Sequence, residues 1–279
     1  MEKDIIINNS NTHYYEQGSA KEQPIIILHG LRGDHGSLIK FGQMFEDYRV
    51  IIPDLPGHGK SDEIASHTME NYSDWLIELI KALNLKQVIV VGHSLGANIG
   101  MVAVKKDQGK NIVKLLSFVL YPKYHNSGIN RGVKTLYKIG KKIPERISKK
   151  LLQSLPISYI TLRTMVSSKD KNHIKWIIRD GHRAAQNVSP KVVIDILEDL
   201  GTNNMIDYAD PSVPQMFVIT SEDKFSHNDE IKKISASVKG ELVEIDQMGH
   251  LAPLEDPQRL MDEIGEWIKL DSSKSRKSA

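Results

Sequence analysis

The chain of 279 residues predicts an α/β fold built on a mostly parallel sheet. Short runs rich in Val, Ile and Leu alternate with longer segments whose apolar residues recur at helical spacing, a pattern typical of a parallel sheet covered by helices. The runs are continuous, which favours strands buried on both faces. With 40% hydrophobic residues and no window near 18 uninterrupted apolar residues, the composition excludes a disordered or membrane-spanning chain.

The apolar runs predict a sheet of about eight strands. Residues 4–17 have the pattern of an antiparallel hairpin that turns around Asn8 and Asn9. Pro53 and Gly92 each stop one of the later runs. The six further strands are expected at 25–28, 48–52, 87–91, 112–120, 214–220 and 241–245.

Helices are expected to flank this sheet at 68–83, 94–106 and 257–270, where apolar residues follow helical spacing. Between residues 121 and 214 the alternation stops, and the sequence becomes almost wholly helical. We interpret this insertion after the sixth strand as a cap over the carboxyl edge of the sheet, where α/β sheets bind ligands. The expected division is a core of 1–122 and 210–270, a helical cap of 123–209 and a disordered tail of 271–279.

Several classes of site are not expected. The absence of cysteine excludes thiol nucleophiles and thiolate metal sites. The first residues lack the apolar stretch of a signal peptide, so a cytoplasmic protein is expected. No cofactor is expected. No metal is expected either, because the histidines are scattered along the chain without ligand spacing, as His13, His35, His67, His125 and His173 show.

The strongest chemical signal is Gly92-His93-Ser94-Leu95-Gly96, which matches G-x-S-x-G. It follows a predicted strand and opens a predicted helix, as a nucleophile elbow does. The two glycines allow a tight turn and close packing of the helix on the strand. The pattern therefore predicts Ser94 as a nucleophile, held in a strained turn at a helix N-terminus.

A serine nucleophile needs two N–H donors aimed at the developing oxyanion. The N–H of Leu95, directly after Ser94, is one candidate. The run His29-Gly30-Leu31-Arg32-Gly33 follows the first central strand, and the N–H of Leu31 is the other. His29 is interpreted as a residue that organises this turn, with possible substrate contact, rather than as a base.

The predicted base is His250, in a loop after the last strand. Asp223 follows the preceding strand in the same way, and would hold the imidazole tautomer and stabilise its charged form. The order Ser94, Asp223, His250 is that of the α/β-hydrolase triad. Glu222 is the rival acid, and Asp246 is a weaker one.

In these motifs the chain resembles the α/β-hydrolase superfamily, from about residue 10 to residue 270. The motifs match in order: His29-Gly30, the run 54–61, the elbow, Asp223 and Gly249-His250. The resemblance implies the fold, the triad and the oxyanion hole. A serine at the elbow argues against haloalkane dehalogenase and epoxide hydrolase activities, because those enzymes use Asp there. One departure is Thr220, three residues before Asp223, where the family usually carries Gly.

The expected function is a serine hydrolase that cleaves a carboxylic ester or thioester of a small-molecule acyl substrate through an acyl-enzyme. Amides, lactones and some C–C bonds also remain open to such a site. The alternatives are a small-molecule-binding protein with little turnover on the same fold, and a peripheral membrane lipase. Possible substrate contacts are Tyr121 and Tyr124, with Tyr159 and Trp176 as guesses from position.

Residues 123–183 contain fifteen Lys or Arg and three acidic residues, a formal charge of +12. Three interpretations remain open. The basic residues can be the solvated side of a cap whose apolar face packs on the sheet. They can form a docking surface for an acidic carrier protein or a CoA thioester, or rest on an anionic membrane surface. Nucleic acid is not expected, because no binding motif accompanies the charge.

Overall fold

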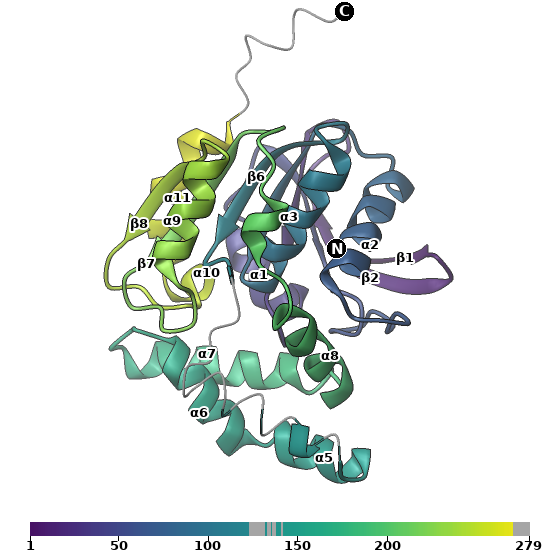
Figure 1. The fold of residues 1–279 in the computed structure, drawn as a ribbon, viewed down its shortest axis with the longest axis vertical. Coiled ribbons are helices and arrows are strands. Elements are labelled where there is room, and N and C mark those ends of the chain that lie inside the picture. Colours follow the sequence, from purple (N-terminus) through teal and green to yellow (C-terminus); the bar gives the residue numbers. More distant parts are fainter. Residues whose placement is uncertain (123–131, 133–134, 136–137, 141, 270–279) are drawn as a thin grey trace, which may run out of the picture.

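The computed structural model describes residues 1–122, 132, 135, 138–140 and 142–269 (Figure 1). The predicted tail of 271–279 lies outside the described residues. Among those that are described, no helix is long and apolar enough to span a bilayer.

One eight-stranded sheet forms the centre, in the order β1-β2-β4-β3-β5-β6-β7-β8. The six strands from β3 to β8 pair in parallel, and β1 and β2 add an antiparallel edge. The sheet and its topology confirm the predicted fold class. The strands are β1 Glu2–Ile7, β2 Ser10–Gln17, β3 Gln23–Leu28, β4 Tyr48–Pro53, β5 Val88–His93, β6 Ile112–Phe118, β7 Gln215–Thr220 and β8 Glu241–Ile245.

Local chemistry explains where several elements begin and end. Asn8 and Asn9 both take positive φ, at 49° and 65°, which suits the two-residue turn between β1 and β2. The strand β6 ends at Phe118, two residues before the predicted end, where Val119 takes a φ of 43°. Thr68 caps the second helix by accepting a hydrogen bond from the N–H of Asn71.

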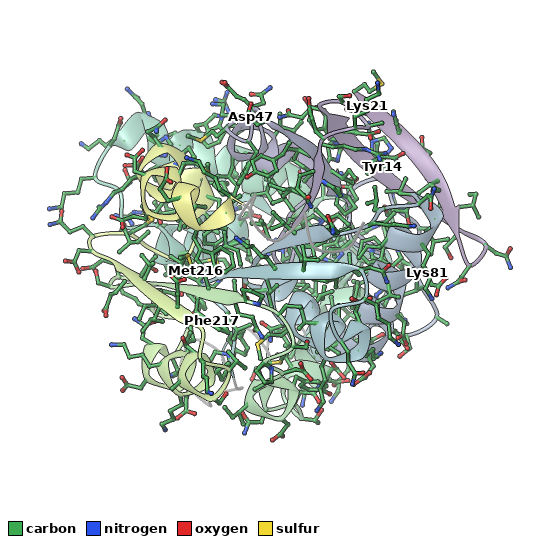
Figure 2. The ribbon with its side chains drawn as sticks, turned by 90° about the horizontal axis from the view of Figure 1, so that it is seen from above. Tyr14, Lys21, Asp47, Lys81, Met216 and Phe217 are labelled. Carbon is green, nitrogen blue, oxygen red and sulfur yellow. The ribbon has the colours of Figure 1, made fainter. Side chains whose placement is uncertain are left out.

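Helices cover both faces of the sheet, and each face has its own apolar cluster. Met216 and Phe217 are neighbours on β7 (Figure 2) and belong to different clusters, because successive strand residues point to opposite faces. Helices α2 Met69–Ala82, α3 Leu95–Asp107 and α9 Asn228–Ser237 pack on the Phe217 side. Helices α1 His35–Gly42, α10 Ala252–Glu255 and α11 Pro257–Ile268 pack on the Met216 side.

Four labelled helices and a short 3-10 helix lie between β6 and β7. Figure 1 shows α5 to α8 gathered at one end of the sheet. They are α5 Glu145–Leu152, α6 Leu155–Met165, α7 Lys171–Ala185 and α8 Pro190–Leu200, followed by the 3-10 helix Met205–Tyr208. Their independence as a cap domain stays a prediction.

Between residues 129 and 151 apolar residues recur at helical spacing, but Ile129, Val133 and Leu136 lie outside the described residues. Ile147 and Leu151 on α5 are exposed, at 57% and 43%, whereas Leu152 is fully buried. On the next helix Leu155, Tyr159 and Ile160 are exposed as well. Ile147 and Leu151 therefore face solvent, and the inward side of α5 is the side of Leu152.

Candidate active site

Ser94 lies in the turn between β5 and α3, with φ 52° and ψ −114°. A positive φ in a residue other than glycine is a strained conformation, and such strain is typical of a nucleophile elbow. Both neighbouring glycines are required by close contacts. A Cβ on Gly92 would lie 2.5 Å from the Cα of Ala97, and one on Gly96 would lie 2.4 Å from the carbonyl oxygen of Leu28.

The structure brings the three predicted residues into one chain of hydrogen bonds. His250 Nε2 lies 3.0 Å from Ser94 Oγ, and His250 Nδ1 lies 2.8 Å from Asp223 Oδ2. Asp223 is fully buried in its side chain, whereas the rivals Glu222 and Asp246 are exposed residues. Of the three candidate acids, Asp223 is thus the one that contacts the imidazole.

Burial raises the pKa of Asp223, but the charge and hydrogen bond of His250 outweigh it. Ser226 and the N–H of Phe225 add further hydrogen bonds, and the pKa falls to about 2. Asp223 is therefore a carboxylate at neutral pH. An ionised acid can hold Nδ1–H of the imidazole in place, which leaves Nε2 free to accept a proton from Ser94.

Contacts from several elements hold the loop that carries His250. The N–H of His250 donates to the carbonyl oxygen of Met165 at 2.8 Å, at the end of α6. Thr220 Oγ donates to the carbonyl oxygen of Gly249 at 3.1 Å. The residue that departs from the family pattern therefore supports the loop beside the triad. The N–H of Gly249 also donates to Glu255 Oε1 at 3.1 Å.

His93 contributes a contact that the sequence did not predict. Its Nε2–H donates to the carbonyl oxygen of His250 at 2.8 Å. Burial, with a smaller effect of the nearby His250, lowers the pKa of His93 to about 3, so the ring is neutral at physiological pH. The place of His93 inside the elbow motif was the one sequence signal for a role, but the motif does not identify its partner, which lies 157 residues later.

The predicted oxyanion loop passes close to Ser94. A Cβ on Gly30 would lie 3.3 Å from Ser94 Cβ, so Leu31 follows a turn that touches the elbow. Leu95 is the first residue of α3, and the N–H of a first residue has no acceptor within its own helix. Leu31 and Leu95 both line the cavity beside Ser94. Their role as oxyanion donors stays a prediction.

His29 is held by the backbone on both sides of its ring. Nε2 accepts from the N–H of Leu55 at 3.0 Å, which leaves Nδ1–H to donate to the carbonyl oxygen of Gly30 at 2.8 Å. Burial lowers the pKa of His29 and favours the neutral ring. These contacts agree with a residue that organises the turn, and the ring also lines the cavity.

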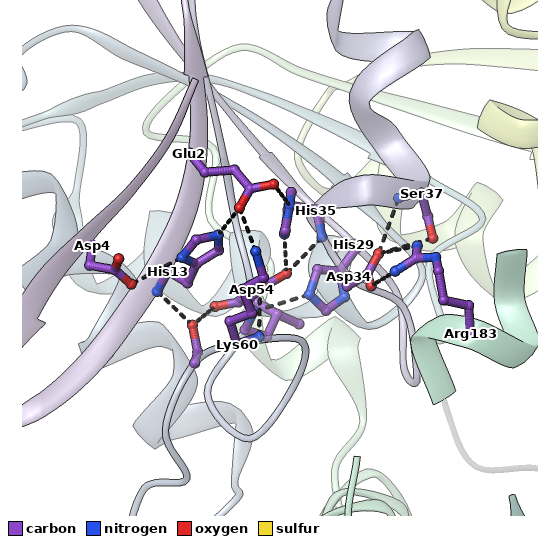
Figure 3. A network of polar contacts seen from close by, with 12 residues as sticks. Glu2, Asp4, His13, His29, Asp34, His35, Ser37, Asp54, Lys60 and Arg183 are labelled. Atoms are coloured by element: carbon purple, nitrogen blue, oxygen red, sulfur yellow. Dashed lines mark hydrogen bonds and ion pairs between the residues drawn. The ribbon is translucent and has the colours of Figure 1, made fainter. Parts of the chain in front are cut away.

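The start of α1 is fastened to α7 by an ion pair (Figure 3). Arg183 binds Asp34 through two hydrogen bonds, of 2.5 and 2.9 Å. Burial raises the pKa of Asp34, but Arg183 outweighs burial and holds that pKa below its ordinary value. Asp34 also caps α1 by accepting from the N–H of Ser37. The ion pair therefore fixes α7 against the turn that carries Leu31.

A cavity of about 190 Å³ opens above Ser94 and His250. Tyr121 lines it, whereas Tyr124 lies outside the described residues. Tyr159 and Trp176 are not among the residues that line it: Tyr159 is 52% exposed, and Trp176 stacks on His173. Most of the walls are apolar and come from α6, α7, α8, the Asp223 loop, the His250 loop and α10, with Ile157, Leu162, Met165, Ile177, Val193, Leu197, Leu200, Phe225, Leu251 and Leu254.

A family model described as the alpha/beta hydrolase fold matches residues 23–118, from β3 to the end of β6. Solved structures extend the likeness over nearly the whole chain. A bromoperoxidase from Bacillus anthracis superposes with a TM-score of 0.82 at 16% identity, covering 97% of this chain and 100% of the other. An esterase from Exiguobacterium antarcticum gives 0.81 at 18% identity, with the same two coverages. The chain therefore has the α/β-hydrolase fold.

Curated relatives match only part of this chain. An (E)-2-((N-methylformamido)methylene)succinate hydrolase of Acinetobacter baylyi is 35% identical over 112 residues, which are 39% of this chain and 42% of the relative. A 2-succinyl-6-hydroxy-2,4-cyclohexadiene-1-carboxylate synthase of Escherichia coli is 34% identical over 79 residues, 28% of this chain and 31% of that protein. The matches thus span less than half of either relative, and the two names denote different reactions.

Proposed function

We propose that this chain, which has the α/β-hydrolase fold, is a serine hydrolase that cleaves a carboxylic ester or thioester. The observation that carries the proposal is the hydrogen-bonded chain from Ser94 Oγ through His250 to the buried Asp223. A strained serine next to an oriented imidazole is the arrangement that activates a hydroxyl as a nucleophile. Similarity to proteins named as a hydrolase and an esterase supports hydrolytic activity in general.

The proposed reaction runs through an acyl-enzyme. His250 Nε2 removes the proton of Ser94 as Oγ bonds to the acyl carbonyl carbon, and the N–H groups of Leu31 and Leu95 bind the resulting oxyanion. The bond to the leaving alcohol or thiol breaks as His250 returns the proton to it. Water then attacks the acyl-enzyme, gives a proton to His250, and releases the acid while Ser94 regains its proton.

The surroundings of the triad support an apolar acyl group as the substrate portion near Ser94. The cavity walls are mainly aliphatic, and an acyl chain bound there loses apolar surface to them. Besides His250, the rings of His93 and His29 line this space, and burial lowers the pKa of both. Neither ring supplies a positive charge for an anionic substrate at neutral pH.

A fluorophosphonate probe tests the nucleophile directly. We expect the wild type to be labelled and to hydrolyse p-nitrophenyl butyrate, and Ser94→Ala and His250→Ala to lose both properties. Ser66→Ala is the matched control, because Ser66 is exposed and remote in sequence from the elbow. A folded wild-type protein that takes no label would contradict the proposal and favour a binding protein on the same fold.

A peripheral lipase is a second candidate, favoured by the exposed side of α5 and α6. Ile147 on α5 and Leu155 on α6 are 57% and 55% exposed, and the exposed residues Arg146 and Lys150 lie on α5 beside Ile147. Apolar side chains beside basic ones suit the interface of an anionic bilayer.

Co-sedimentation with phosphatidylglycerol vesicles tests this candidate. We expect binding that falls with added salt and is weakened by Ile147→Ser with Leu155→Ser. Leu242→Ser is the control, because Leu242 is exposed on β8, outside these helices. If the same amount of protein sediments with and without vesicles, the lipase proposal is refuted and the esterase proposal is unaffected.

A further inference from the structure

A second cluster of titratable side chains lies at the N-terminal hairpin (Figure 3). Glu2 comes from β1, His13 from β2, and His35 is the first residue of α1. One ligand atom from each of these three residues lies within 4.8 Å of the other two. The cluster shares no residue with the Ser94, His250 and Asp223 chain.

Each histidine of the cluster has its own carboxylate partner. His13 Nδ1 lies 3.0 Å from Asp4 Oδ1, and His35 Nδ1 lies 2.9 Å from Asp54 Oδ1. A carboxylate binds the protonated ring nitrogen, so the proton of each neutral ring resides on Nδ1 and the lone pair on Nε2. Histidines that ligate metals usually have such a second partner, which fixes the tautomer and the direction of the ring.

The two Nε2 atoms face the carboxylate of Glu2. His13 Nε2 lies 3.3 Å from Glu2 Oε2, and His35 Nε2 lies 3.7 Å from Glu2 Oε1. His13 is only 5% exposed, and its Nε2 has no hydrogen-bond partner despite its burial. A buried nitrogen lone pair that faces a carboxylate is unfavourable unless a proton or a cation lies between them.

We propose that Glu2, His13 and His35 bind a zinc ion through one carboxylate oxygen and the two Nε2 atoms, with water as the fourth ligand. Two imidazoles and a carboxylate suit Zn²⁺, whereas Ca²⁺ and Mg²⁺ prefer oxygen ligands throughout. Ligands about 2.0 to 2.1 Å from a tetrahedral zinc are separated by about 3.3 Å. The measured separations of 3.3 and 3.7 Å from Glu2 therefore need only a small adjustment.

Charge and access also favour a divalent cation at this cluster. Glu2, Asp4 and Asp54 surround two rings that can be neutral, and Lys60 is the cation paired with Glu2. The side chain of Glu2 is 49% exposed, so an ion can enter from solvent. Lys60 is itself 58% exposed and can leave Glu2 for water, which makes it a competitor of the metal.

A zinc ion here would join three separate parts of the chain. Two of its ligands come from the antiparallel edge, and His35 begins the helix that follows the oxyanion loop. Asp54 accepts from His35 Nδ1 and from the N–H of His35 and Lys60, so it already fastens α1 to the loop after β4. The proposed role is to stabilise this junction, because none of the three ligands belongs to the triad.

Zinc titration of the untagged, chelator-treated full chain against a fluorescent zinc indicator tests the site. We expect one zinc ion per chain, and visible absorption typical of tetrahedral coordination when Co²⁺ replaces zinc. Glu2→Gln and His13→Gln should each weaken zinc binding at least tenfold. Lys60→Met should strengthen binding severalfold, because the competing ammonium is gone. His182→Gln is the matched control and should bind as the wild type does.

Circular dichroism shows whether each variant is folded. Glu2→Gln is the decisive variant, because the side chain at position 2 is half exposed and the substitution changes its shape little. Wild-type zinc binding in folded Glu2→Gln and His13→Gln would overturn the proposal, since the metal would then lie on other histidines. The absence of any zinc binding by the wild type would overturn it equally. Unchanged affinity in Lys60→Met would refute the competition between this lysine and the ion.

Discussion

His93 donates a hydrogen bond from Nε2 to the carbonyl oxygen of His250 at 2.8 Å, so the residue before the strained serine holds the loop that presents the imidazole. The rings of the two histidines lie 5.5 Å apart, and Phe225 lies at the same distance from the ring of His250. The elbow thus fixes both the proposed nucleophile, Ser94, and the backbone of its proposed base, His250.

Replacing His93 by Ala is expected to lower kcat for p-nitrophenyl butyrate by about tenfold to a hundredfold, because the imidazole is less well placed for proton transfer. KM should change little, since the cavity walls remain. Steady-state kinetics of the variant beside His182→Ala, a histidine outside the triad, measure the effect. An unchanged kcat would show that the contact does not position His250.

Replacing Asp223 by Asn should reduce kcat by about 10⁴, because the amide favours the wrong imidazole tautomer and cannot stabilise the imidazolium. Glu222→Gln should leave kcat near the wild-type value, since Glu222 is exposed and Asp223 occupies Nδ1. Single-turnover release of p-nitrophenol measures both variants. A larger loss in Glu222→Gln would reverse the assignment of the acid.

The lowered pKa of Asp223 predicts a particular dependence of stability on pH. Its folded pKa of about 2 lies below the usual value near 3.9, so the ionised form stabilises the folded chain above about pH 4. That stabilisation, about 2 kcal/mol, should disappear as the pH falls from about 4 to 2. Urea unfolding of wild type and Asp223→Asn at several pH values should show their difference shrinking in this range. A difference that stays constant would contradict the depressed pKa.

Replacing Arg183 by Met should lower the free energy of unfolding by about 2 kcal/mol, because the buried carboxylate of Asp34 loses its partner. The expected loss is below that of a fully buried pair, since the Arg183 side chain is 49% exposed. Urea unfolding of Arg183→Met, Asp34→Asn and the double variant gives the coupling energy. Arg146→Met, on an exposed part of α5, serves as the control, and a coupling of zero would show that the pair contributes nothing.

The parts of the site predicted from the sequence are those with local signals. Ser94 was identified by two glycines and a strand–turn–helix pattern within a few residues, and chain order added Asp223 and His250. The family pattern expects glycine at position 220. It therefore does not predict that the hydroxyl of Thr220 supports the His250 loop.

The parts that were missed depend on contacts between distant segments. No ligand spacing along the chain connects Glu2, His13 and His35. Glu2 and His13 come together only because β1 and β2 pair in the fold. Ile147 and Leu151 share helical spacing, yet both are exposed and the neighbouring Leu152 is buried. Helical periodicity identifies an apolar face but not what covers it.

Gly96 lets α3 approach the carbonyl oxygen of Leu28, which locks the serine turn to the strand that leads into the oxyanion loop. The walls of the cavity, by contrast, come largely from helices in the segment between β6 and β7. Backbone contacts therefore constrain the residues that position Ser94, whereas the side chains that line the cavity can be replaced more easily. If the proposed function holds, exchange of side chains on α6, α7 and α8 changes which acyl chain fits the cavity, while the arrangement of Ser94, His250 and Asp223 stays unchanged.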